Sequence, residues 1–120
     1  MTNERFDDYP DDWLPEASET LVRNWGVPVE ALDGPSDWDR VLHALTERVG
    51  YLLTHRPEKL ATAMYLLDIS EAEFAKALDQ PSHADRAHAL ALAILHRETQ
   101  KIRTRRAYAS GRLERKTGGD

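Results

Sequence analysis

Residues 83–108 read HADRAHALALAILHRETQKIRTRRAY, and this stretch decides the fold class because it contains neither glycine nor proline. Its apolar residues recur at the spacing of one helical face, and Ser82 stands where a helix N-cap is expected. A helix of this length measures about 39 Å, against a diameter of roughly 35 Å for a compact chain of this size. The stretch therefore predicts a long C-terminal helix that spans the domain or projects beyond it.

The inner face of this predicted helix changes from apolar to charged along its length. The apolar part consists of Ala84, Ala87, Leu90, Ala91, Ile94 and Leu95. At nearly the same azimuth follow charged residues, with Ile102 as the main apolar exception. We expect such a helix to have left the core, so that its charges meet water or an acidic partner. The candidate interaction residues are Arg97, Lys101, Arg105, Arg106 and Tyr108.

Three further helices are predicted upstream. The first covers residues 37–55 with Ser36 as N-cap, and the second covers residues 57–67. The third follows the capping box SEAE at residues 70–73 and ends near Leu78. The second helix is apolar nearly all round, so we expect it to be the most buried. The fold class that follows is all-α: an irregular four-helix bundle with a long C-terminal helix and an acidic N-terminal arm.

Charge divides the chain into segments of opposite sign. Residues 1–40 hold 11 acids and 3 bases, a net charge of −8, whereas residues 97–120 hold 8 bases and 3 acids, a net charge of +5. We predict an acidic, tryptophan-containing arm at 1–35, a helical domain at 36–110 and a flexible basic tail at 111–120. The acidic and basic ends could meet within one chain, between two chains or with outside partners.

The arm is too rich in large apolar residues for a solvated tail. Trp13 and Trp25 are the candidate anchors of the arm on the helical body. A short helix from Glu19 to Trp25 is predicted, with Ser18 as its cap and Gly26 at its end. We therefore expect much of the arm to lie across the helical body.

Several kinds of chemistry lack their residues. The chain has no cysteine, which excludes disulfides, thiolate catalysis and cysteine-ligated metals. Its histidines and carboxylates lack the spacing of zinc or calcium motifs, and it has no nucleophile elbow or glycine-rich phosphate loop. We expect no enzyme, no cofactor and no metal. The acidic N-terminus lacks an apolar signal-peptide core and no run is long enough for a membrane span, so we expect a cytoplasmic protein without a membrane partner.

Two stretches resemble a group of small helical bacterial proteins that have no known function. MYLLDISEAEFAKAL (64–78) is similar to a pattern LYRIDVSE followed by a short helix, and AILHRETQKIRTRRAY (93–108) is similar to IIERxxQKxxxRxxY. The chain departs from the group at Leu66, where arginine is usual, and at His96, where glutamate is usual. The resemblance implies a helical fold and no activity. The matching residues are Tyr65, Asp68, Ile69, Ser70, Glu71, Arg97, Gln100, Lys101, Arg105 and Tyr108.

The two stretches suggest one structural ion pair. Asp68 ends the second helix, and Arg97, Lys101 and Arg105 continue the inner face of the last one. We predict that Asp68 pairs with one of these bases and fixes how the last helix crosses the bundle.

Three functions remain open from the sequence. The leading hypothesis is a non-catalytic protein-interaction or self-association module, with a homodimer as one form. The alternative is a nucleic-acid accessory protein that uses the basic end of the last helix. Residues 60–78 have the layout of a helix-turn-helix, but the acidic second helix would repel phosphate. A small enzyme ranks third, because no catalytic pair can be assembled from the sequence.

Overall fold

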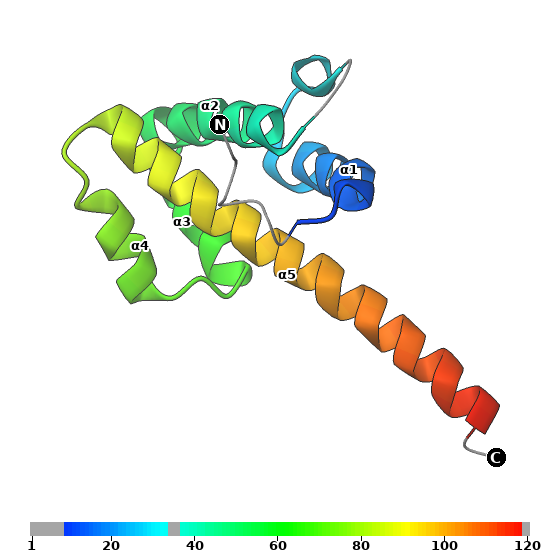
Figure 1. Ribbon diagram of the computed structural model, residues 1–120. Coiled ribbons are helices and arrows are strands. Elements are labelled where there is room, and N and C mark those ends of the chain that lie inside the picture. Colours follow the sequence, from blue (N-terminus) through cyan, green and yellow to red (C-terminus); the bar gives the residue numbers. More distant parts are fainter. Residues whose placement is uncertain (1–8, 34–36, 119–120) are drawn as a thin grey trace.

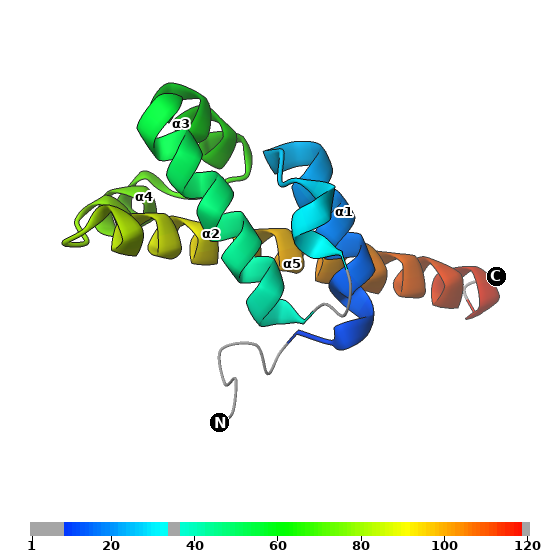
Figure 2. The ribbon, with the colours of Figure 1, turned by 90° about the horizontal axis from the view of Figure 1, so that it is seen from above.

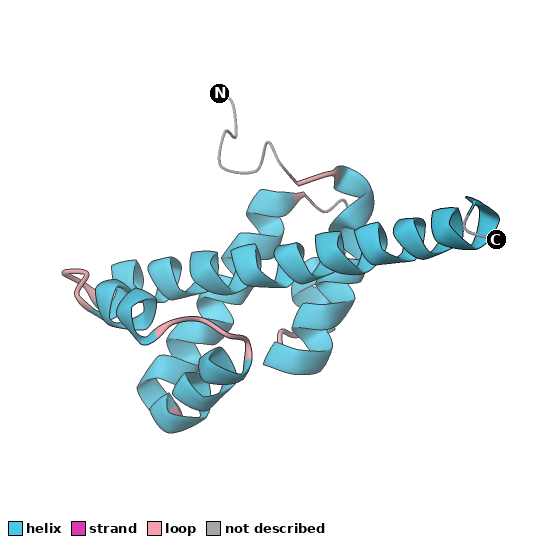
Figure 3. Cartoon of the chain, turned by 90° about the horizontal axis from the view of Figure 1, so that it is seen from below, coloured by secondary structure: helices cyan, strands magenta, loops and turns pink. Residues whose placement is uncertain are grey.

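The computed structural model describes residues 9–33 and 37–118, with side chains up to Ser110. These residues hold five α-helices and two short 3-10 helices joined by short loops, and they contain no strand (Figure 3). The predicted all-α class is confirmed. In chain order the elements are η2 (Asp11–Trp13), α1 (Leu14–Trp25), η3 (Val29–Leu32), α2 (Trp38–His55), α3 (Pro57–Leu66), α4 (Glu71–Leu78) and α5 (His83–Gly118) (Figure 1).

The long helix α5 is the spine of the molecule. Helix α2 crosses it and shares the largest interface with it, and α3 lies between α4 and α1 (Figure 2). The 36 residues of α5 rise about 54 Å, which matches the longest dimension of the molecule, 55 Å. The helix therefore spans the whole body, and its C-terminal end extends past the other helices (Figure 1).

The last helix is longer than predicted. It continues beyond the expected end at Tyr108 to Gly118, so residues 111–118, assigned from the sequence to a flexible tail, are helical. Five of its eight residues are arginine, leucine, glutamate or lysine, which favour helices, whereas Gly111, in the interior of the helix, costs only about 1 kcal/mol.

The N-terminal segment contributes a full helix to the core. Helix α1 begins earlier than predicted and takes Pro15 into its first turn, so Ser18 lies inside the helix and does not cap it. Gly26 ends the helix in the left-handed conformation, with φ of 74°. The inner face of α1 joins the same core as α2 and α5 through Ala17, Leu21 and Trp25.

Helix α3 is peripheral, which corrects the expectation that it is the most buried element. Only Leu60 and Met64 of this helix are buried. Tyr65 and Leu66 are 74% and 73% exposed, respectively. When a helix has apolar residues on every side, the sequence pattern does not identify which side is buried. Here one side of α3 packs on α2, and the rest faces solvent.

The core face of α5 also continues further than its charges suggested. Glu98 and Thr99 are buried at 4% and 2% exposure, and Ile102 is fully buried. The helix therefore has not left the core at Leu95, because α1 covers this next stretch. The Glu98 carboxylate accepts a hydrogen bond from Trp25.

Side-chain caps fix where three helices begin. The Ser70 hydroxyl accepts from the Glu73 N–H at 3.1 Å and the Ser82 hydroxyl from the Asp85 N–H at 3.0 Å, as the sequence predicted. Helix α2 is capped by Asp37, whose carboxylate accepts from the Arg40 N–H at 2.9 Å. The predicted cap, Ser36, lies outside the described residues. In the part of the chain that is described, no helix combines the length and apolarity needed to cross a membrane.

Candidate functional site

The C-terminus of α3 is held in a Schellman motif. The Ile69 N–H donates to the Met64 carbonyl at 3.1 Å, and the Asp68 N–H donates to the Tyr65 carbonyl at 3.0 Å. The motif requires one left-handed residue, and Asp68 takes that conformation with φ of 67°, alone among the described non-glycine residues. Glycine is usual at this place because it lacks Cβ, and aspartate is one of the few residues that tolerate it.

Arg97 of α5 clamps the C-terminal end of α3 through its guanidinium group. Its Nε donates to the Leu67 carbonyl at 3.0 Å, and its Nη2 lies 3.5 Å from Asp68 Oδ2. Of the three bases predicted to pair with Asp68, Arg97 is therefore the one beside it. The side chain of Asp68 is 79% exposed, so the charge pair itself contributes little, and the bond to the carbonyl is the stronger restraint.

The clamped end presents two large apolar side chains to solvent. Tyr65 and Leu66 are adjacent in the sequence and are mostly exposed. Their backbone is fixed by the Schellman motif and by Arg97, so little conformational freedom would be lost if a partner covered them. We call this pair the α3 face.

A pocket of about 360 Å³ opens where α1, α3 and α5 meet, directly beside the α3 face. Its apolar lining comes from Trp25, Ala63, Leu66 and Leu67, and its polar lining from Arg23, Asn24, Glu98 and Lys101. We call it the junction pocket. Its size falls within the range of about 300–1,000 Å³ that is usual for small-molecule sites.

Glu98 is the buried charge of the junction pocket. Its Oε2 accepts a hydrogen bond from Trp25 Nε1 at 2.8 Å. Among the described residues, this indole is the only hydrogen-bond donor to the carboxylate. A buried carboxylate is stabilised by each further hydrogen-bond donor that reaches it. The carboxylate lines the pocket, where a ligand could supply further donors.

Two cations complete the pocket. Arg23 of α1 and Lys101 of α5 are both exposed. Neither forms an ion pair with a carboxylate in the described part of the chain. The junction pocket thus combines one buried acid with two unpaired cations and an apolar wall.

The basic residues further along α5 are engaged by the acidic arm. Arg105 Nη2 lies 2.8 Å from Glu16 Oε2, and Arg106 lies 3.2 Å from Glu16 Oε1 and 3.3 Å from Asp12 Oδ2. We call these four residues the arm clasp. The hydrogen bond from Arg105 holds the pKa of Glu16 below its ordinary value of 4.5; partial burial opposes this, while the hydrogen bond from Arg106 and both positive charges add to it.

Aromatic contacts support the arm clasp. The guanidinium groups of Arg103 and Arg106 lie 5.5 Å and 5.9 Å from the ring centroid of buried Trp13. Tyr9 packs edge-on against Trp38 at 5.0 Å between centroids and forms a hydrogen bond with His96 Nδ1. The described part of the arm therefore lies on its own chain in this structure.

The candidate residues from the sequence thus fall mainly into three places. Arg105 and Arg106 lie in the arm clasp with Trp13, whereas Lys101 and Trp25 lie at the junction pocket. Arg97 and Asp68 border the α3 face. Tyr108 is 60% exposed.

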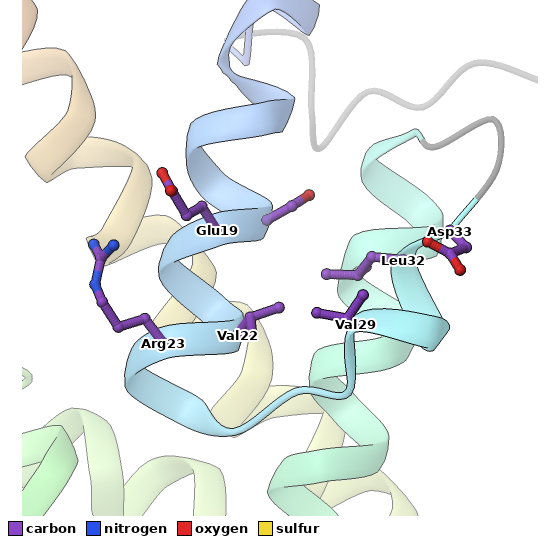
Figure 4. Close-up of a pocket in the computed structure, with 7 residues that line it drawn as sticks. Glu19, Val22, Arg23, Val29, Leu32 and Asp33 are labelled. Atoms are coloured by element: carbon purple, nitrogen blue, oxygen red, sulfur yellow. The ribbon is translucent and has the colours of Figure 1, made fainter.

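A second groove lies between α1 and η3. It has a volume of about 460 Å³, and Val22, Val29 and Leu32 point toward one another across it (Figure 4). Arg23 of α1 lines both this groove and the junction pocket (Figure 4). The groove has no buried polar group to orient a ligand, so the junction pocket is the better candidate.

Sequence reasoning missed three of the four polar residues that line the junction pocket, namely Arg23, Asn24 and Glu98. Glu98 lies four residues after Ile94 and four before Ile102, so a buried carboxylate could have been predicted from that spacing. Arg23 and Asn24 had no comparable signal, because their place depends on how α1 packs against α5. Comparisons of this chain with protein-family models, with curated proteins and with solved structures found no match.

Proposed function

We propose that the chain is a non-catalytic interaction module that pairs with a second copy of itself through the α3 face. The observation that carries the proposal is the exposure of two adjacent large apolar residues, Tyr65 and Leu66, on a clamped helix end. A two-fold contact brings the same patch of both copies together, so an apolar pair is self-complementary. The proposal keeps the cytoplasmic location expected from the sequence.

The basic residues of α5 are not the proposed docking surface, because several of them already have partners in their own chain. Arg105 and Arg106 already contact carboxylates of their own chain, and Arg97 is bound to a backbone carbonyl. A nucleic-acid phosphate would have to displace these contacts. The nucleic-acid alternative remains a prediction of the sequence, and none of these contacts favours it.

The dependence of binding on salt concentration distinguishes self-association from nucleic-acid binding. The chain carries a net charge of −5, so two copies repel each other and salt screens that repulsion. We therefore expect self-association to strengthen with salt, whereas binding of a basic helix to nucleic acid weakens steeply with salt.

Light scattering on a sizing column tests the proposal at low and high salt. We expect a molar mass approaching twice 13.7 kDa at high protein concentration for the wild-type chain. The double variant Tyr65→Ser/Leu66→Ser should stay near 13.7 kDa. Tyr51→Ser, which changes a 52% exposed tyrosine on α2, is the matched control and should behave as wild type. A wild-type chain that stays monomeric at every concentration and salt level would contradict self-association.

A further inference from the structure

The junction pocket places opposite charges close together with neither satisfied by the other. Glu98 is 4% exposed and has one hydrogen-bond donor among the described residues, the Trp25 indole at 2.8 Å. Lys101 follows it by one helical turn, a spacing that brings side chains to about 5–6 Å between Cβ atoms. Lys101 nevertheless lies outside ion-pair distance of Glu98, and so does Arg23 across the pocket.

This charge pattern suits a ligand that carries both signs. A simple cation would be attracted to Glu98 but repelled by Arg23 and Lys101. A simple anion would be attracted to the two cations and would leave the buried carboxylate uncompensated. An ammonium group and a carboxylate attached to the same carbon atom of one molecule satisfy both ends at once.

We propose that the junction pocket binds a small zwitterion of the α-amino acid class with an aliphatic side chain. The ammonium donates to Glu98, and the carboxylate accepts from Arg23 and Lys101. The aliphatic group packs on Ala63 and Leu67, which line the apolar wall. This site shares Leu66 with the α3 face but does not rest on the proposed self-association.

The competing interpretation is an internal one. Lys101 has a flexible stem and lies one turn from Glu98, so in solution it could swing inward and neutralise the carboxylate. In that case the pocket would hold a salt bridge and no ligand. The two interpretations differ in whether an added zwitterion binds, and in which of its groups are needed.

Three probes of similar shape separate the contributions of the two charges. L-leucine carries both groups, 4-methylpentanoate lacks the ammonium, and 3-methylbutylamine lacks the carboxylate. Each would be titrated into the full chain and followed by amide NMR shifts. We expect leucine to shift the signals of residues 23–25, 63–67 and 98–101. Each analogue should bind at least about tenfold more weakly, because each lacks one charge-assisted contact.

Glu98→Gln tests the role of the buried charge while keeping the shape of the side chain and an acceptor for Trp25. We expect it to fold, and to weaken leucine binding at least about tenfold. Glu19→Gln removes an exposed carboxylate of α1 outside the pocket and should leave binding unchanged. If Glu98→Gln does not fold, Lys101→Gln at the exposed rim should give the same loss.

Three results would overturn the proposal. One is the absence of leucine-dependent shifts in the wild-type chain up to the solubility limit. Another is equal binding of leucine and of either analogue. The third is unchanged leucine binding in Glu98→Gln or, should that variant not fold, in Lys101→Gln. None of these readings depends on the molar mass, so failure of the site and failure of self-association are distinguishable.

Discussion

The arm clasp and the α3 face each differ from what their residues suggest in the sequence, and they differ in opposite directions. The arm clasp is built from charged residues that suggest an open binding surface, yet Arg105 and Arg106 are paired with carboxylates of the arm. The α3 face is built from apolar residues that suggest a core, yet Tyr65 and Leu66 are exposed. The exposed surface is therefore the apolar α3 face, whereas the charged residues of the arm clasp already contact one another.

The largest expected effect is on the free energy of unfolding, and it comes from comparing a buried leucine with an exposed one. Leu21→Ala should lower the free energy of unfolding by about 2–5 kcal/mol, because Leu21 is fully buried where α1 joins the core. Leu66→Ala should change it by less than about 0.5 kcal/mol, because that side chain is mostly in water. Urea unfolding of both variants gives the two values.

Equal losses in the free energy of unfolding of the two leucine variants would contradict this account. A small loss for Leu21→Ala would mean that α1 is not part of the cooperative core. A large loss for Leu66→Ala would mean that the α3 face is covered within the monomer. The slope of the unfolding curve should be the same as for the wild-type chain in both variants.

Substitutions at the residues that end α1 and α3 should change the stability by an intermediate amount. Gly26 has φ of 74°, and a Cβ added there would lie 2.8 Å from Arg48 Nη2. Gly26→Ala should therefore destabilise the chain by about 1–2 kcal/mol, since it adds left-handed strain and displaces Arg48, whose Nε donates to the Trp25 carbonyl at 2.9 Å.

Asp68→Gly should act in the opposite direction. Glycine relieves the strain at φ of 67° and removes only an exposed charge pair with Arg97, so we expect a gain of up to about 1 kcal/mol. Thermal unfolding at low salt measures both changes. A clear loss in Asp68→Gly would show that the ion pair with Arg97 contributes more than its exposure suggests.

The smallest expected effect is the pH dependence of the arm clasp. The pKa of Glu16 is lowered in the folded chain, so the stabilisation is present above its ordinary value of 4.5 and is lost as the pH falls through the lower folded value. Glu16→Gln should cost about 0.3–1 kcal/mol at neutral pH and low salt. The difference from wild type should shrink on acidification and with added salt, as followed by urea unfolding.

A difference between Glu16→Gln and wild type that persists well below pH 4.5 would contradict this assignment. It would mean that the glutamate acts through packing and not through its charge. Glu19→Gln is the matched control on the same helix, because Glu19 is exposed and lies outside the arm clasp.

Local features of the fold could be predicted from the sequence, and tertiary features could not. The capping residues Ser70 and Ser82 act within a few residues of their own positions, so their hydrogen bonds follow from local sequence. The long helix was predicted for the same reason, since nothing between His83 and Tyr108 interrupts it. Its extension to Gly118 was missed because residues 111–120 were assigned to a flexible basic tail.

The errors concern which side of a helix is covered. Helix α3 is apolar on all sides, so periodicity could not identify its exposed side. The stripe of α5 was judged by charge, whereas Glu98 is buried because Trp25 supplies a donor and α1 supplies the cover. The pairing of Arg105 with Glu16 joins residues far apart in the chain, and charge balance alone left its partner open.

The most direct test uses the absence of cysteine from the chain. A single cysteine in place of Tyr65 would lie near the two-fold axis of the proposed pair, where a disulfide can form between copies. Under mild oxidation we expect Tyr65→Cys to give a disulfide-linked dimer, whereas Tyr51→Cys, at a 52% exposed position on α2, should form no disulfide between copies. Crosslinking of both variants to the same extent, or of neither, would contradict docking through the α3 face.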